Sequence, residues 1–297
     1  MLLLTVLATS VGILLGLLGG GGSILTVPIL VYLVGMQAKS AIITSLIVVG
    51  ITSLIAVFNH ARHGRVCWKT GFVFGLAGML GAYMGGQAAA FIPGTVLLVL
   101  FAVVMLAAAL AMLRNNRSRA AAATAVGSRF CPLQLPILPI IFDGFLVGLI
   151  TGLVGVGGGF LLVPALNHLA GLPMHAAIGT SLFIITLQSV AALAGHAGHL
   201  EIDVQLTELF TVCAVIGSFI GSALSGKISS QYLKQGFGVF VLLLGCFLLY
   251  HEVNRETLAQ IHTLIQENRQ FILGAVTVVI VSLLYRLWLW VHNLQAK

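Results

Sequence analysis

The sequence predicts an all-α polytopic membrane protein made of two homologous repeats, and three observations support this fold class. Hydrophobic residues make up 59% of the 297 residues and charged residues only 7%, so hydrocarbon is the main solvent of the chain and a soluble fold is excluded. Apolar runs long enough to cross a hydrocarbon core of roughly 30 Å recur along the chain. A residue pattern also returns after 136 positions, which is typical of transporters built from internal repeats.

The apolar runs give the order of the expected helices. The first run resembles a secretory signal, but no basic residue precedes it and its counterpart 136 residues later is internal, so we expect it to be the first helix. The last run stands outside the repeat and is expected to form an extra C-terminal helix. The runs lie near residues 2–18, 41–58, 71–90, 95–113, 136–154, 176–194, 206–225, 235–250 and 271–291.

Each repeat contains a helix that is interrupted by glycines. The stretch Gly16–Pro28 returns as Gly152–Pro164. The segments after the glycines, 23–34 and 160–170, correspond to roughly 17–18 Å of helix and cannot span a bilayer alone. We therefore expect re-entrant half-helices, because glycine permits a sharp reversal of the chain and proline resists a straight helix.

The distribution of charge predicts the domain boundaries and the sidedness. We expect a first transmembrane repeat at 1–113, a basic cytoplasmic linker at 114–135, a second transmembrane repeat at 136–250, and an interfacial helix with an additional transmembrane helix at 251–297. The loop at 59–70 is basic, whereas the equivalent loop at 195–205 carries Glu201 and Asp203 without Lys or Arg. By the positive-inside rule these loops face opposite sides, which favours inverted repeats; parallel repeats follow if the broken segment crosses only once.

Polar groups at repeated positions are the candidate binding residues for an anion. The N–H groups at a helix N-terminus attract negative charge, so the glycine-led half-helices are one candidate, and glycines that only permit close packing are the alternative. Hydroxyl and amide side chains on the long helices are another, although Ser and Thr often bond their own backbone in membranes. The candidates are Gly20, Gly21, Gly22, Ser23, Thr44, Ser45, Gly157, Gly158, Gly159, Thr180, Ser181 and Gln188.

Histidines and one acid are the candidate proton relay. The spacing H-x-x-H occurs at His60 and His63 and again at His196 and His199. We interpret these histidines as interfacial, with proton coupling and metal binding as alternatives. Asp143 lies inside the helix that enters the second repeat, and intramembrane carboxylates are usually functional. The relay would consist of Asp143, His60 and His196, and we expect no metal site and no cofactor.

The cysteines and the net charge favour neither disulfides nor a nucleic-acid partner. The cysteines show no C-x-x-C spacing, so we expect free thiols. The formal net charge of +7 is dispersed along the chain and indicates membrane sidedness rather than nucleic-acid binding. The expected partners are the lipid bilayer and a small anion. The cysteines are Cys67, Cys131, Cys213 and Cys246.

Four features together resemble the TauE/SafE family of sulfite and organosulfonate exporters: the motif G-L-x-G-x-G-G in each half, the Thr-Ser pairs, the run at 63–68, and Gly217–Ser222. The resemblance covers about residues 2–250. It implies a multi-pass transporter of the bacterial inner (plasma) membrane, not an enzyme, with a small inorganic or organic sulfur anion as substrate. Family members usually carry Asp before the Trp of that run; here Cys67 takes this place, and Asp203 keeps it in the second half.

We interpret the chain as an exporter of sulfite or an organosulfonate that works by alternating access across the plasma membrane. An anion channel is the first alternative, because opposed half-helices also line selective pores. An intramembrane enzyme is the second, although serine and histidine occur at repeat-related places instead of converging in one asymmetric site. The identity of the anion, the direction of transport, proton coupling and a homo-oligomeric state stay open.

Overall fold

The structure is a computed structural model and describes residues 2–18, 21–114, 131, 137–155, 159–168, 172–196, 202–225, 230–253, 257 and 260. No strand occurs in these ranges, and the all-α prediction is confirmed. The elements are α1 (Leu2–Leu18), η1 (Gly21–Leu25), α2 (Thr26–Pro28), η2 (Ile29–Leu33), α3 (Ala38–Arg62), α4 (Trp68–Ala89), α5 (Gly94–Arg114), α6 (Ile137–Val154), α7 (Gly159–His168), α8 (Met174–Gly195), α9 (Val204–Ser225) and α10 (Ser230–Glu252).

The helices follow the hydropathy of the sequence. Every apolar run predicted up to residue 250 falls on a helix. The predicted run at 271–291 lies outside the described residues, as does nearly all of the interfacial helix predicted at 251–270. Within the described ranges, the helical stretches long and apolar enough to cross a membrane are Ala38–Arg62, Trp68–Ala89, Ala176–Gly195 and Val204–Leu224.

The two short segments differ in regularity. In the first repeat a 3-10 turn (η1), a short α-helical turn (α2) and a π-helical turn (η2) follow one another. The π-helical turn begins directly after Pro28, which donates no backbone hydrogen bond and crowds the preceding turn. In the second repeat α7 is one ten-residue α-helix. Both segments are as short as predicted, and their re-entry into a membrane stays a prediction.

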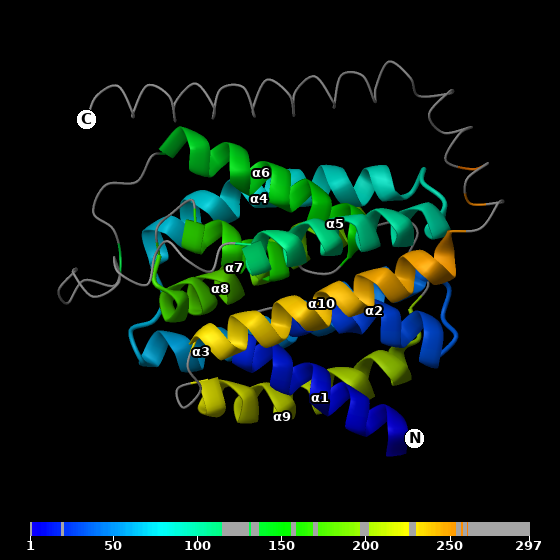
Figure 1. The fold of residues 1–297 in the computed structure, drawn as a ribbon, viewed down its shortest axis with the longest axis horizontal. Helices are drawn as coiled ribbons and strands as arrows, with labels where there is room; N and C mark the ends of the chain where they lie inside the picture. Colours follow the sequence, from blue (N-terminus) through cyan, green and yellow to red (C-terminus); the bar gives the residue numbers. More distant parts are fainter. Residues whose placement is uncertain are drawn as a thin grey trace. The chain divides into compact units, whose positions relative to one another are not determined.

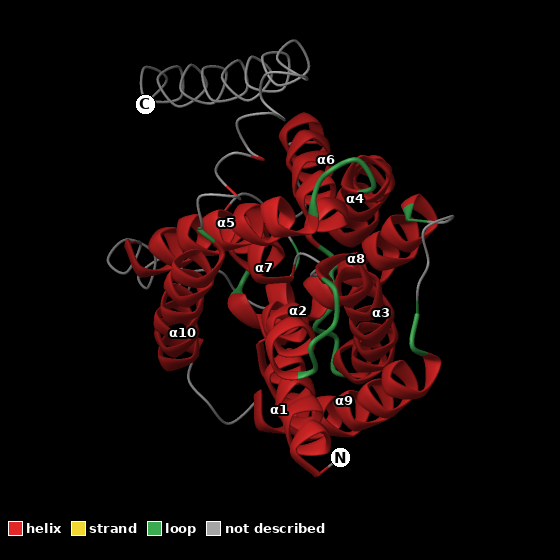
Figure 2. Cartoon of the chain, turned by 90° about the vertical axis from the view of Figure 1, so that its right-hand side faces the viewer, coloured by secondary structure: helices red, strands yellow, loops and turns green. Residues whose placement is uncertain are grey.

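Helices from different repeats pair with one another. In the first pair α1 packs along α9, and in the second α4 packs along α6. Figure 2 shows the two pairs on opposite sides of the bundle, with α3 and α8 between them. By its contacts the chain divides only at His251 and Glu252, so the repeats are not separate compact domains. The predicted boundaries of the repeats and the linker stay predictions.

Glycines set the close approach inside these pairs. A Cβ on Gly12 would collide with the carbonyl oxygen of Ala214, and a Cβ on Gly148 would collide with that of Gly78. Because 12 + 136 = 148 and 78 + 136 = 214, one contact becomes the other when the repeats are exchanged. Small residues of this kind let membrane helices pack closely. The same exchange of repeats relates three more pairs of close contacts. These are Gly16 with Ser218 and Gly152 with Ala82, Gly81 with Phe145 and Gly217 with Thr9, and Gly85 with Leu149 and Gly221 with Ile13.

Equivalent helices run in opposite directions in the structure. In Figure 1, α1 and α9 run from right to left, whereas α6 and α4 run from left to right. Each helix of a pair is therefore parallel to its neighbour and opposed to its own repeat equivalent. A pseudo-twofold axis across the helices would produce this arrangement.

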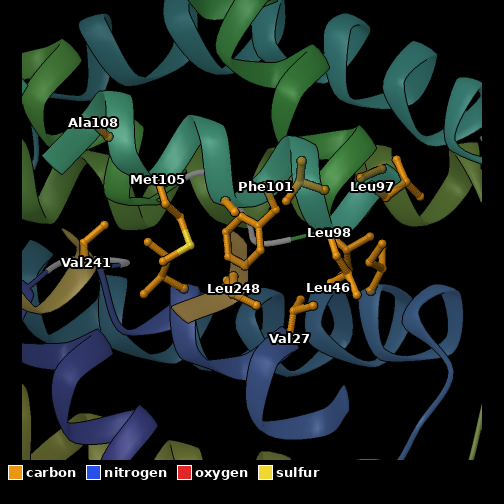
Figure 3. Close-up of a cluster of buried hydrophobic side chains, with 14 of the residues drawn as sticks. Val27, Leu46, Leu97, Leu98, Phe101, Met105, Ala108, Val241 and Leu248 are labelled. Carbon is orange, nitrogen blue, oxygen red and sulfur yellow. The ribbon is translucent and has the colours of Figure 1, made fainter. Parts of the chain in front are cut away.

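A large apolar cluster fixes α5 on the bundle. Figure 3 shows Leu98, Phe101 and Met105 of α5 directed toward Val241 and Leu248 of α10 and toward the first short segment. All five of these side chains are at most 3% exposed. Removing a buried side chain of this size costs about 2–5 kcal/mol, so α5 and α10 form a stable cover over the short segments.

Candidate functional site

Buried polar residues line the contacts that α8 makes with α3 and with α4. A Cβ on Gly50 of α3 would lie 3.0 Å from the Cβ of Ser189 on α8. Ser53 follows Gly50 by one turn and shares its face of α3. Gln188 precedes Ser189, and its carboxamide lies against Gly78 of α4, in space that a side chain at Gly78 would fill.

Among the described residues, these polar side chains find no hydrogen-bond partner. The side chains of Ser53, Gln188 and Ser189 are at most 2% exposed. Within the described residues, neither serine hydroxyl and neither polar atom of the Gln188 carboxamide makes a hydrogen bond. An unsatisfied buried group costs about 1–3 kcal/mol, and such groups in native proteins call for a water, an ion or a ligand. We call Ser53, Gln188 and Ser189 the crossing cluster.

The predicted Thr-Ser pairs do not lie together. The Thr180 hydroxyl accepts a hydrogen bond of 2.9 Å from the backbone N–H of Cys67, at the start of α4. Ile43, directly before Thr44, lines a pocket with Ala89, at the end of α4. The 22 residues of α4 span about 33 Å. The two pairs therefore lie toward opposite ends of the bundle, and one small anion cannot contact both.

The hydroxyls of the two pairs also differ in their partners. Ser181 donates to the carbonyl of Ile178 in its own helix, with 2.8 Å between the oxygens, as Ser and Thr commonly do in membranes. The hydroxyls of Thr44 and Ser45 are fully buried, and neither makes a hydrogen bond to the described residues. A polar ligand could therefore use Thr44 and Ser45 without breaking an existing bond.

The glycine-led segments contact each other through η1 and α7. Gly21 and Gly22 lie in η1, and Gly159 is the first residue of α7. Ser23 is fully buried. This contact brings together the two segments that were expected to present N–H groups. The remaining glycines, Gly20, Gly157 and Gly158, lie outside the described residues.

Gly155 ends α6 with a left-handed backbone. Its φ is +72°, and its N–H donates to the carbonyl of Thr151 at 2.8 Å, as a C-terminal glycine of a helix does. A Cβ at this position would collide with Ile42 of α3. The second glycine motif therefore begins with a reversal that only glycine permits.

A polar cavity of about 210 Å³ opens where α3 ends. Asn59 donates from Nδ2 to the Ser222 hydroxyl at 2.6 Å across it, joining α3 to α9. His60 and Arg65 in its wall also pack against Gly179, the residue before Thr180. We call it the His60 cavity. Its lining residues are Asn59, His60, His63, Arg65, Ser222 and Ala223.

The equivalent histidine, His196, lines a pocket of only about 30 Å³. Apart from Lys39 and His196, its wall is apolar or backbone. Lys39 donates from Nζ to the carbonyl of Ala90 at 2.8 Å, and Nδ1 of His196 lies 2.9 Å from the carbonyl oxygen of Ala192. We call it the His196 pocket. A space of this size holds a water molecule or two and no larger anion.

The three members of the predicted proton relay are separated. His60 and His196 are buried and line the His60 cavity and the His196 pocket, at opposite ends of α4. Asp143 is buried in the second turn of α6, and its neighbour Gly144 packs on Phe74 of α4. A direct transfer between the two histidines is excluded by this separation. The part of the chain that the structure describes holds no group of three His, Cys, Asp or Glu side chains able to bind a metal.

Comparison with known proteins decides the family. Residues 4–248 match the family described as "Sulfite exporter TauE/SafE". The chain belongs to the TauE/SafE family. This membership confirms the resemblance and makes the chain a member of a membrane-transporter family. The TauE/SafE match covers both repeats and ends before the C-terminal extension.

TauE/SafE relatives carry names of the same kind. A "Probable membrane transporter protein" of Xylella fastidiosa is 34% identical over 244 residues, 81% of this chain and 91% of the relative. One of Methanocaldococcus jannaschii is 28% identical over 83% of this chain and 94% of its own length. "Sulfite exporter TauE/SafE family protein 6" of Arabidopsis thaliana is 33% identical over 33% of this chain and 23% of its own. No solved structure matches the chain.

This TauE/SafE chain contains a disulfide that was not expected. Cys67 is bonded to Cys131, with 5.6 Å between their Cα atoms, so the expectation of four free thiols is wrong for this pair. Cys213 and Cys246 are free. The two bonded residues are 64 positions apart, and their proximity depends on the fold, which spacing alone does not reveal.

Sequence reasoning also missed several polar residues of this TauE/SafE chain. Ser53 and Ser189 of the crossing cluster are repeat equivalents, because 53 + 136 = 189. The 136-residue offset that identified Thr44 and Thr180 as equivalent could therefore also have identified Ser53 and Ser189. Thr26, whose buried hydroxyl has no partner among the described residues, is matched by Leu162 and gave no such signal. The residues missed are Thr26, Ser53, Asn59, Ser189 and Ser222.

Proposed function

We propose that this TauE/SafE protein is a carrier that exports a small sulfur oxyanion, sulfite or an organosulfonate, by alternating access. The observation that carries the proposal is the crossing cluster, whose buried hydroxyl and amide groups lack partners among the described residues. Hydroxyl and amide donors bind an oxyanion without a fixed positive charge that would trap it. Substrate sites in repeat-built transporters lie near the midplane between the repeats, and α3 and α8 are equivalent helices of the two repeats.

The His60 cavity supports the same proposal as an entry for the anion. Arg65 and the two histidines offer donors, and the cavity is polar. A lining with positive charge raises the local concentration of anions. At the opposite end the described residues form the small His196 pocket. One open end and one closed end are what a carrier presents in each state of its cycle.

We propose that the repeats are inverted across a bacterial inner (plasma) membrane, with the basic 59–70 loop and the basic linker in the cytoplasm. The opposed directions of equivalent helices in Figure 1 support this topology, and the positive-inside rule gives its orientation. The His60 cavity would then open to the cytoplasm. An inside-negative potential favours export of an anion by about 2.3 kcal/mol per charge per 100 mV, so coupling to a proton is not required.

Anion flux in proteoliposomes tests the proposal. Purified protein is reconstituted, and uptake of sulfite, an organosulfonate, sulfate and thiosulfate is measured with and without a pH gradient. We expect saturable sulfite or organosulfonate flux that is accelerated by the same anion on the opposite side. Flux that neither saturates nor shows this acceleration would indicate a channel instead.

The crossing cluster is tested by Gln188→Glu, which keeps the shape and adds a negative charge. We expect binding to weaken at least ten- to a hundredfold, because a charge-assisted hydrogen bond worth about 1.5–3 kcal/mol is replaced by repulsion. The matched control is Gln87→Glu, an exposed glutamine of α4 that bonds Tyr83. Ligand-induced thermal stabilisation measures binding independently of flux. Unchanged half-saturation in Gln188→Glu would move the site elsewhere.

A further inference from the structure

The Cys67–Cys131 disulfide joins a buried sulfur to an exposed residue. Cys67 is 2% exposed, whereas Cys131 is exposed. Cys67 is also the residue before the first turn of α4. A nucleophile from solvent therefore reaches this disulfide from the Cys131 side, and the other sulfur lies at a helix N-terminus.

The equivalent residue in the second repeat shows which kind of group caps the N-terminus of the equivalent helix. Asp203 stands 136 residues after Cys67 and receives a hydrogen bond of 3.1 Å from the N–H of Leu206, at the start of α9. An anionic oxygen thus caps α9. At α4 the residue before the helix makes no side-chain cap bond, because its sulfur is held in the disulfide. Cleavage of the disulfide would give Cys67 an anionic thiolate at the N-terminus of α4, the place equivalent to that of the Asp203 carboxylate at α9.

We propose that Cys67–Cys131 is a reactive disulfide that soft sulfur nucleophiles, sulfite or a thiolate, open at Cys131. The lone pair on the sulfur of sulfite attacks Sγ of Cys131. A new S–S bond forms between sulfite and Cys131, the bond between the two cysteines breaks, and its electron pair leaves on Cys67 as a thiolate. The two negative charges of sulfite are divided between the S-sulfonate on Cys131 and the Cys67 thiolate, so no further oxidant or reductant is needed.

The direction of this reaction follows from access and from the leaving group. Exchange is faster at the accessible sulfur and when the departing thiolate is stabilised. The N–H groups at a helix N-terminus stabilise a thiolate, as do nearby cations. Arg65 and Lys69 each lie two residues from Cys67. Both factors make Cys131 the site of attack and Cys67 the leaving group.

The surroundings link this disulfide to the proposed transport path. The backbone N–H of Cys67 donates to Thr180 of α8, next to Gly179, against which two residues of the His60 cavity pack. In the proposed topology this end faces the cytoplasm, where disulfides are usually transient and redox-sensing rather than structural. A reaction at Cys131 would thus release α4 from residue 131 beside the cavity. The choice of sulfite as the nucleophile rests on the proposed function, whereas the reaction with a thiolate does not depend on it.

The test treats the purified, oxidised full-length protein with sulfite, with glutathione, or with sulfate as the unreactive control. Peptide mass spectrometry under non-reducing conditions then locates the adduct. We expect the sulfite adduct on Cys131 about tenfold more often than on Cys67. We also expect sulfite to open the Cys67–Cys131 disulfide about tenfold faster than it opens the disulfide of oxidised glutathione. Glutathione should give its mixed disulfide at the same residue. Adducts divided equally between the cysteines, or a rate no faster than that of oxidised glutathione, would overturn the proposal.

Two double variants separate this inference from the transport function. Cys67→Asp with Cys131→Ser mimics the opened form and should melt at a higher temperature than Cys67→Ala with Cys131→Ala, because Asp caps a helix and Ala does not. Equal melting temperatures would contradict the capping role of the thiolate. Sulfite flux that persists in both variants, with no adduct in the wild type, would reject only the reactive disulfide. Adduct formation without sulfite flux would reject only the proposed substrate.

Discussion

The two ends of the α3–α8 pair carry equivalent histidines but very different cavities. The His60 cavity has a volume of about 210 Å³ and a polar wall, whereas the His196 pocket has about 30 Å³ and a mostly apolar wall. The histidines themselves do not explain the difference, because both are buried. The cause must lie in the residues around them.

Two pairs of equivalent residues account for the difference. At the open end the Asn59 side chain bonds to Ser222. The equivalents are Gly195, since 59 + 136 = 195, and Gly86, since 86 + 136 = 222. A Cβ on Gly195 would lie only 3.2 Å from Cα of Gly86, so the backbones of α8 and α4 touch where side chains separate α3 and α9. The repeats therefore specify different ends, and in the proposed carrier the exchange between open and closed states would not be fully symmetric.

The largest expected difference between the two ends is the side of the membrane that each one faces. In a background with Cys213 and Cys246 replaced by Ser and without the Cys67–Cys131 pair, a cysteine is placed at His63 or at its equivalent His199. Inverted repeats with a cytoplasmic basic loop predict that an impermeant thiol reagent outside intact cells labels the second variant and not the first. Labelling of both variants, or of neither, would favour parallel repeats. Permeabilised cells provide the control, since both variants should then react.

Of the substitutions that test the two ends, filling the closed end should have the largest effect on stability. The Cβ introduced by Gly86→Ser would lie 2.7 Å from the carbonyl oxygen of Ala192 and 2.8 Å from Nδ1 of His196. Overpacking of this kind costs about 1–3 kcal/mol, and the closed end could form only with a backbone shift. We expect a lower melting temperature and a loss of transport. The control is Gly236→Ser, a helical glycine with nothing within 4 Å of an added Cβ, which should behave as wild type.

Much of this comparison could be read from the sequence, and some of it could not. The 136-residue offset gave the helix order and the equivalence of His60 with His196. It did not show that α1 would pair with α9 rather than with a helix of its own repeat, because nearly uniform hydrophobicity leaves no polar face to mark the contact surface. The offset also pairs Asn59 and Ser222 with two glycines, Gly195 and Gly86. Only the distances in the folded chain show that Asn59 contacts Ser222 and that Gly195 approaches Gly86.

The candidate site was predictable in its residue types but not in its grouping. Gln188 was selected from sequence, and the structure buries its carboxamide against Gly78 of α4, without a hydrogen-bond partner among the described residues. Thr44 and Thr180 were selected by the same symmetry, yet their helices put them toward opposite ends. Repeat equivalence identifies pairs that a pseudo-twofold axis would relate. It does not say how far each pair lies from that axis, and only residues near it can share one small ligand.

The positive charge of the open end gives a smaller, electrostatic prediction. Arg65 lines the His60 cavity, whereas Lys39 at the other end is bonded to a backbone carbonyl. Arg65→Gln should raise the half-saturation concentration for the anion about three- to tenfold, or about 0.7–1.4 kcal/mol, and the effect should shrink as salt screens the charge. Lys39→Gln should change it less than twofold when the anion enters from the His60 side. Equal effects of the two variants would remove the functional difference between the ends.

The smallest expected effect is that of the hydrogen bond between Asn59 and Ser222. A hydrogen bond of this kind contributes about 0.5–1.5 kcal/mol, and a double-mutant cycle of Asn59→Ala with Ser222→Ala isolates it from the packing of each side chain. We expect a coupling energy in that range for thermal unfolding, because the bond of 2.6 Å joins α3 to α9 at the mouth of the cavity. The exposed pair Gln87 and Tyr83, bonded at 2.9 Å within α4, is the control and should couple by less. Additive single effects at Asn59 and Ser222 would mean that the cavity is held open by helix packing alone, without a contribution from this bond.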